Sequence, residues 1–257
     1  MIHHHNHLVL DDLTICYRKR PAVHHLSCAL PCGGLVGIVG PNGAGKTTLL
    51  HGILGWLPLT SGRVVWNGHE VPNSAGVISW LGQRRSADLG FPIDVAGVVA
   101  TGRYARLGLW RGFRDPDYAA VDHAMQAMGV TGLAQRPFAE LSGGQQQRTL
   151  IARALASGAE VLLLDEPLTG LDEPSGRDLL RRLKEWAAGG RLAIAVIHDL
   201  ATVRTWCDHV LLLNRELIAA GPTAETMSDA HVGRCYGEGP VVRSSGRPVV
   251  DEEHSHV

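Results

Sequence analysis

The sequence contains no apolar run that approaches the roughly 18 residues needed to span a bilayer. Its first ten residues also lack the basic start and apolar stretch of a secretory signal. The formal net charge is −1, so the basic excess that usually marks a nucleic-acid partner is missing. The five cysteines are an odd number without metal-finger spacing, which favours a reducing compartment. Together these absences predict a cytoplasmic protein with no nucleic-acid partner.

Short apolar runs alternate along the chain with longer helical patterns. The apolar runs predict buried strands, and they occupy residues 35–39, 161–165, 192–198 and 209–214. Helices fit between them, for example from about residue 45 to 56 and from Glu173 to a glycine pair. This alternation predicts an α/β protein with a mostly parallel sheet covered by helices.

Two regions depart from that rhythm. Residues 7–33 and 62–82 resemble short strands joined by turns, which predicts an antiparallel edge subdomain. Residues 84–158 look purely helical, and Asp115 with Pro116 predicts a cap and first turn there. We therefore expect one domain over residues 1–236 with an inserted helical subdomain. Residues 237–257 are rich in small and polar residues and are expected to form a loose tail.

The stretch "GPNGAGKT" at residues 40–47 matches the phosphate-loop pattern. Its context fits, because a predicted buried strand precedes it and a predicted helix follows it. Glycines allow backbone N–H groups to surround phosphates, and the helix N-terminus attracts the same anions. Lys46 would face the β- and γ-phosphates, and the Thr47 hydroxyl is a suitable Mg²⁺ ligand.

Acidic residues follow at the end of another predicted strand. In "VLLLDEP" at residues 161–167, Asp165 and Glu166 would emerge at the edge of the sheet where ligands bind. Asp165 suits the Mg²⁺ shell, and Glu166 could polarise an attacking water. His198 ends the next predicted strand and would reach the same crevice. No guanine-reading Asn-Lys-x-Asp stretch is present, so ATP is favoured over GTP.

A second potential anion site lies at "LSGGQ", residues 141–145, where serine and glycines precede an apolar helical pattern. The ordered set of Tyr17, the phosphate loop, Gln83, "LSGGQ", "VLLLDEP", "LTGLD" and His198 resembles the ATP-binding cassette (ABC) family over residues 8–235. The resemblance implies a P-loop, RecA-like core and a homodimer. In such a dimer each ATP lies between the phosphate loop of one copy and the "LSGGQ" loop of the other.

The resemblance also implies individual roles. Glu166, His198, Gln83 and Lys46 would be catalytic, with Glu166 as the base and His198 on the γ-phosphate. Thr47, Gln83 and Asp165 would hold Mg²⁺, and Asp172 would lie at the dimer seam. ATP would contact Tyr17, Gly40, Pro41, Asn42, Gly43, Ala44, Gly45, Lys46, Thr47 and Thr48 of one copy, and Leu141, Ser142, Gly143, Gly144 and Gln145 of the other. An ordinary surface position remains open for Tyr17.

A narrower resemblance concerns the cargo. The stretches "FPIDVAGVVATGRYARLGLW" and "LSGGQQQRTLIARALA" are similar to ATPase subunits of bacterial importers for zinc, manganese or iron(II). The similarity of "YRKRPAVHHLS" and "VIHDLATVRTWCDHVLLLNRELIAAGPTAE" to such subunits favours zinc, and manganese, iron(II) or an iron chelate are the alternative cargoes. A non-transport ABC ATPase and a catalytically inactive binding module are rival functions. The narrower resemblance implies a membrane permease, an extracytoplasmic metal-binding protein and a peripheral position on the cytoplasmic face of the inner membrane. The aromatic residues Phe91, Trp110 and Phe113 either receive the permease or pack the lobe internally.

Overall fold

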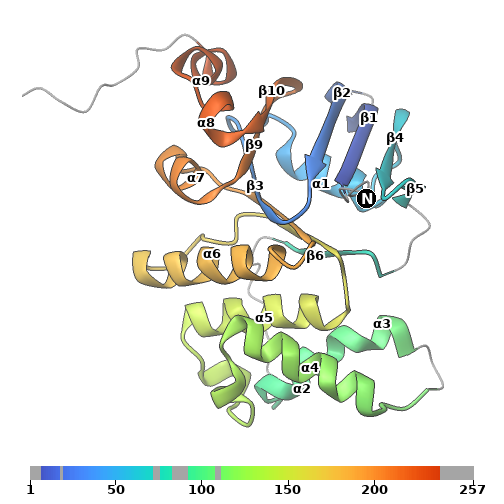
Figure 1. The fold of residues 1–257 in the computed structure, drawn as a ribbon, viewed down its shortest axis with the longest axis vertical. Helices are drawn as coiled ribbons and strands as arrows, with labels where there is room; N and C mark the ends of the chain where they lie inside the picture. Colours follow the sequence, from blue (N-terminus) through green and yellow to red (C-terminus); the bar gives the residue numbers. More distant parts are fainter. Residues whose placement is uncertain (1–6, 18–19, 72–75, 83–91, 108–110, 238–257) are drawn as a thin grey trace, which may run out of the picture.

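The computed structural model describes residues 7–17, 20–71, 76–82, 92–107 and 111–237. Figure 1 shows two β-sheets in the upper half of the molecule and a group of helices, α2 to α5, in the lower half. Helix α6 lies between the sheets and that lower group, which we call the helical lobe. The fold therefore has a sheet-containing core and a separate helical part.

The core is a six-stranded sheet in the order β10-β9-β3-β8-β7-β6. Strand β10 runs antiparallel to β9, and the remaining neighbours are parallel. The strands are β3 (Gly34–Val39), β6 (Ile78–Leu81), β7 (Val161–Leu164), β8 (Leu192–Val196), β9 (His209–Asn214) and β10 (Glu216–Pro222). The apolar runs of β3, β7, β8 and β9 are continuous because both faces of a parallel sheet are covered. The predicted mostly parallel α/β core is confirmed.

Successive residues of β3 enter two different hydrophobic cores. Leu35 and Val39 face one core with α5 and α6, whereas Val36 and Ile38 face a second core. The second core is closed by α1 (Lys46–Ile53) and by the smaller sheet. This packing on both faces holds the carboxyl end of β3, where the phosphate loop begins.

The smaller sheet is antiparallel, in the order β2-β1-β4-β5. It contains β1 (His7–Tyr17), β2 (Arg20–Pro31), β4 (Ser61–Trp66) and β5 (His69–Glu70). The prediction was wrong in one part, because β6 was expected here and instead pairs in parallel with β7. Strand β6 is an edge strand with only one of its four residues buried, so its sequence lacks the apolar run of its neighbours.

The helical lobe contains α2 (Val95–Ala100), α3 (Tyr104–Leu107), α4 (Asp115–Met128) and α5 (Gly143–Ala156), with short 3₁₀ turns at Thr101–Arg103, Thr131–Leu133 and Phe138–Glu140. The predicted cap of α4 was wrong by one residue. Arg114 is the N-cap and Asp115 is already helical. The carboxylate of Asp117 accepts the Arg114 N–H at 3.1 Å, which satisfies a backbone donor at the start of the helix.

The remaining helices are α6 (Glu173–Ala187), α7 (Leu200–Trp206), α8 (Thr223–Thr226) and α9 (Asp229–Tyr236). Helices α7, α8 and α9 lie along one side of the six-stranded sheet, at the left of Figure 1. Among the described residues, no helix combines the length and apolar character needed to cross a membrane.

Candidate functional site

The phosphate loop, residues 40–47, connects the buried end of β3 to α1. Gly43 and Gly45 have left-handed backbones with φ of +78° and +96°, which glycine adopts without steric cost. A Cβ on Gly45 would lie 2.3 Å from the Ala22 carbonyl oxygen, and one on Gly40 would lie 1.9 Å from the Leu213 carbonyl oxygen. The glycines are thus required both by the turn and by close packing on β2 and β9.

Lys46, the first residue of α1, is only 8% exposed. Its Nζ donates to the carbonyl oxygens of Gly40 and Pro41, each at 2.8 Å. Burial lowers the pKa of Lys46, while the carboxylates of Glu166 and Asp165 act in the opposite direction. The phosphate loop therefore holds the Lys46 ammonium group in a position where it would attract a polyphosphate.

Thr47 and Asp165 lie next to each other although 118 residues separate them in the sequence. The Thr47 hydroxyl donates to Oδ2 of Asp165 at 2.9 Å. Burial raises the pKa of Asp165, and the Thr47 hydrogen bond opposes that effect. A hydroxyl and a carboxylate are both oxygen donors, so this pair fits the preference of Mg²⁺ for hard oxygen ligands.

Glu166 and His198 also meet, with His198 Nε2 and Glu166 Oε1 2.7 Å apart. His198 lies two residues beyond the end of β8, so it follows the strand that was expected to end with it. The Glu166 backbone is left-handed, with φ of +53°. Thr169 donates its hydroxyl to the other carboxylate oxygen at 3.3 Å, a contact that no local sequence pattern indicated. The site thus pairs a partly exposed carboxylate with an imidazole.

The signature loop, residues 141–145, forms the start of α5. Ser142 is the N-cap; its hydroxyl accepts the Gln145 N–H at 3.4 Å, and the Gln145 side chain accepts the Ser142 N–H at 3.0 Å. This capping box fixes the first turn of the helix. A Cβ on Gly144 would lie 3.2 Å from the hydroxyl of Ser175 in α6, so the loop packs tightly on that helix. The predicted helix start is confirmed.

The structure brings the phosphate loop, Asp165, Glu166 and His198 to the same end of the parallel sheet. It does not join the signature loop to them. The phosphate loop rests on β2 and β9, whereas the signature loop rests on the start of α6. Figure 1 shows the same separation, with α1 among the sheets and α5 in the helical lobe.

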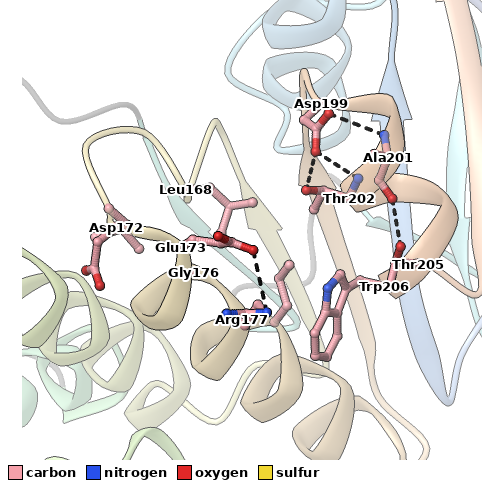
Figure 2. Close-up of a pocket in the computed structure, with 12 residues that line it drawn as sticks. Leu168, Asp172, Glu173, Gly176, Arg177, Asp199, Ala201, Thr202, Thr205 and Trp206 are labelled. Carbon is pink, nitrogen blue, oxygen red and sulfur yellow. Dashed lines mark hydrogen bonds and ion pairs between the residues drawn. The ribbon is translucent and has the colours of Figure 1, made fainter. Parts of the chain in front are cut away.

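Asp172 is the N-cap of α6 and borders a pocket of about 360 Å³ between α6 and α7. Figure 2 shows Asp172, Glu173 and Arg177 on one side of this pocket and Asp199, Thr202 and Trp206 on the other. Asp199 caps α7 by accepting N–H groups from Ala201 and Thr202, at 3.3 and 2.8 Å. This N-cap fixes the backbone directly after His198. The sequence signal for such a cap is an Asp immediately before a helical pattern.

Several predicted site residues lie outside the described residues or are described only in part. Gln83, Phe91 and Trp110 lie outside them. Tyr17 is the last residue of β1, but its side chain is not among those described. Phe113 is partly buried and contacts the rings of Tyr104 and Tyr118, with centroid distances of 6.0 and 5.3 Å. The lobe therefore carries a partly exposed aromatic cluster.

Comparison with known proteins identifies related chains over most of the length. A family model described as "ABC transporter" matches residues 23–169. The chain is 38% identical to the manganese transport system ATP-binding protein MntB of Listeria monocytogenes, over 92% of this chain and 99% of the relative. It is 39% identical to the zinc transport system ATP-binding protein TroB of Treponema pallidum, over 89% and 86%. The solved structure of cbiO1 from Clostridium perfringens, part of the ABC transporter complex cbiONQ, superposes with a TM-score of 0.77, 26% identity and coverage of 90% and 94%.

Proposed function

The chain belongs to the ABC transporter family and is an ATP hydrolase of that family, and we propose that it powers import of a divalent transition-metal ion through a separate membrane permease. The observation that carries this proposal is the similarity to metal transport ATP-binding proteins over about nine-tenths of the chain. The cluster of Lys46, Asp165, Glu166 and His198 supports the ATPase part of the proposal, because it supplies the groups that ATP hydrolysis needs.

Binding of ATP would use the phosphate loop and the following Thr48, with Tyr17 stacking on adenine. The helix N-terminus at Lys46 and the lysine charge attract the phosphates. Thr47, Asp165 and Gln83 would hold Mg²⁺, and the contact of Thr47 with Asp165 supports this assignment for two of the three. When bound, Mg²⁺ neutralises charge on the β- and γ-phosphate oxygens.

Hydrolysis would use Glu166 as the general base. Its carboxylate would take a proton from the attacking water as the water oxygen bonds to the γ-phosphorus. The bond from that phosphorus to the β–γ bridging oxygen would break, so that ADP leaves with the bridging oxygen and inorganic phosphate is released. His198 lies 2.7 Å from that carboxylate and would both orient it and hold the γ-phosphate. Thr169 holds the second carboxylate oxygen, so the base is fixed from two sides.

Each ATP site would be completed by a second copy of the chain. The N-terminus of α5 carries a partial positive charge that would attract the γ-phosphate. In the proposed dimer, that phosphate belongs to an ATP molecule bound by the phosphate loop of the other subunit. The separation of the signature and phosphate loops in one chain supports a head-to-tail homodimer. Asp172, at the rim of the pocket in Figure 2, would lie at the seam.

Membrane permease subunits would dock on the helical lobe near residues 84–113, and we infer from the sequence that Phe91, Trp110 and Phe113 would supply apolar contacts. In this proposed arrangement the protein would lie on the cytoplasmic face of the membrane. An extracytoplasmic metal-binding protein would select the ion. Because the ATPase does not touch the cargo, its own residues cannot distinguish one ion from another.

The cargo is proposed to be zinc, with manganese as the alternative that the relatives' names also support. We would measure whole-cell metal content in a strain lacking this gene, grown with limiting chelated metal. Zinc or manganese should fall and be restored by the wild-type gene but not by a Lys46→Ala variant, which controls for ATP use. Unchanged zinc, manganese and iron would contradict a metal cargo while leaving the ATPase activity intact.

A further inference from the structure

Three aromatic rings connect the end of helix α1 to strand β6. The rings of Trp56 and Trp80 lie edge to face, with centroids 4.6 Å apart. His51 contacts both, with centroid distances of 5.5 Å to Trp56 and 5.6 Å to Trp80. The Trp56 N–H also donates to the His51 carbonyl oxygen at 2.9 Å. His51 belongs to α1 and Trp80 to β6, so this aromatic clamp (His51, Trp56 and Trp80) joins the two elements.

The Trp80 ring is held closely on its other side. A Cβ on Gly82 would lie 2.1 Å from Cη2 of Trp80, so the indole rests directly on the Gly82 backbone. Trp80 also packs against the second core, on the same face of the sheet as α1. Within the described part of the chain, its buried Nε1 has no hydrogen-bond partner. Ring packing therefore sets the position of Trp80, and no hydrogen bond of the indole contributes.

The clamp completes a closed circuit of contacts around Thr47 and Asp165. The Thr47 hydroxyl donates to Asp165, which joins the start of α1 to the end of β7. The Asp165 N–H donates to the Leu81 carbonyl oxygen at 2.9 Å, which joins the end of β7 to β6. Trp80, the residue before Leu81, contacts His51 and so joins β6 back to α1. His51 lies one helical turn beyond Thr47.

The spacing of Thr47 and Asp165 matters because Mg²⁺ demands near-ideal octahedral geometry and short metal–oxygen distances. A shift of α1 against β6 and β7 would move the hydroxyl relative to the carboxylate. The single hydrogen bond between these two side chains resists such a shift only modestly. The clamp adds resistance, because the same shift would break the contact between His51 and Trp80.

We propose that Trp80 is a positioning residue for the Mg²⁺ that accompanies ATP. It acts through the clamp, which sets the spacing of Thr47 and Asp165, rather than through contact with the metal. This inference rests on the proposed function of Thr47 and Asp165 as Mg²⁺ ligands. Loss of the clamp should therefore weaken ATP binding in the presence of Mg²⁺ and leave metal-free binding intact.

The test measures ATP binding by calorimetric titration, once with Mg²⁺ and once with EDTA. The parent and all variants carry Glu166→Gln, so that ATP is not hydrolysed. Trp80→Phe keeps an aromatic ring, withdraws it from Gly82 and loses no hydrogen bond. Gly82→Ala instead forces the ring away from the backbone. Trp186→Phe is the matched control, because Trp186 is also half-buried but packs on the other core from α6.

With Mg²⁺, Trp80→Phe and Gly82→Ala should each weaken ATP binding about 10-fold, as loss of a residue that supports a metal ligand does. With EDTA, both should bind ATP as the parent does. Trp186→Phe should match the parent under both conditions. Adding Trp80→Phe to Asp165→Asn should have little further effect, because the clamp acts through that carboxylate. Thermal unfolding of each variant identifies any loss of folding, and Trp80→Phe remains decisive if Gly82→Ala does not fold.

Equal weakening with Mg²⁺ and with EDTA would show a general structural effect and would overturn the proposal. Parental affinity of Trp80→Phe in Mg²⁺, or a full additional effect on top of Asp165→Asn, would overturn it as well. A parent whose ATP affinity does not depend on Mg²⁺, or that does not bind ATP, would contradict the proposed nucleotide and metal site, and the inference with it.

Discussion

At the scale of single residues, Glu166 shows how the fold prepares a group for chemistry. A left-handed backbone at a non-glycine residue costs about 1–3 kcal/mol and persists only where surrounding contacts hold it. Here His198 and Thr169 each hold one carboxylate oxygen, and the Thr169 N–H donates to the Glu166 carbonyl at 3.2 Å. These contacts hold the strained backbone in place, and the two on the carboxylate oxygens fix the orientation of the side chain.

Replacing Glu166 by Gln should remove the base and keep the shape of the side chain. We expect ATP turnover to fall about 100-fold or more, because general-base catalysis is lost. ATP binding should survive, since the phosphate loop is unchanged, and the unhydrolysed nucleotide should stabilise a dimer visible by light scattering. Turnover at the wild-type rate would remove Glu166 from the role assigned to it.

At the scale of helices, the lobe is organised around the fully buried carboxylate of Asp117. It accepts bonds from Arg103, at 2.6 and 3.1 Å, and from Arg111, at 2.6 Å. Arg103 also donates to the Ala156 carbonyl oxygen at the end of α5. This ion-pair cluster joins the start of α4 to the far end of the helix that begins at the signature loop.

Asp117→Asn should destabilise the protein, because the nearly buried guanidinium of Arg103 loses the charge that compensates its burial. The melting temperature at pH 7 should fall by about 5 °C or more. The hydrogen bond with Arg103, followed by the Arg114 backbone and the Arg111 charge, holds the pKa of Asp117 below its usual range. Its stabilisation is therefore complete above about pH 4 and is lost as the pH falls through the lowered folded-state pKa.

The measurement is thermal unfolding of the variant and the wild type between pH 7 and 3. The gap between the two melting temperatures should stay constant to about pH 4 and narrow below it. Asp178→Asn serves as a comparison, because the Asp178 carboxylate also pairs with arginines, Arg182 and Arg148, but is 30% exposed. The difference in melting temperature between Asp178→Asn and the wild type at pH 7 should therefore be smaller. A gap that widens towards acid pH would contradict the assignment.

The sequence was sufficient to predict the helices and strands whose hydrophobic pattern is local. Strands β3, β7, β8 and β9 are apolar on both faces, and the order of strands then places Asp165 and Glu166 near Lys46. Strand β6 was misassigned because its partner β7 lies some eighty residues away and its own faces are only partly buried. Thr169 was missed for a different reason: its contacts with Glu166 are local, three residues apart, but they lie in a turn that no helix or strand pattern marks.

At the scale of the whole molecule, the two loops proposed to contact ATP lie in different parts of the fold. The phosphate loop belongs to the sheet core, while the signature loop belongs to the helical lobe and packs on α6. Arg148 of α5 pairs with Asp178 of α6 at 3.3 Å, which strengthens the contact between lobe and core. In the proposed homodimer one chain offers two half-sites, and a second copy completes each of them.

The most direct test measures occluded ATP in mixtures of Glu166→Gln chains that also carry Lys46→Ala or Ser142→Arg. Each double variant alone should retain no nucleotide after rapid desalting, since every site in its homodimer lacks one half. The mixture should retain up to one ATP per heterodimer, against two for the Glu166→Gln parent, because one composite site is intact. Occlusion by the Ser142→Arg chain alone at the parental level would contradict the two-chain site.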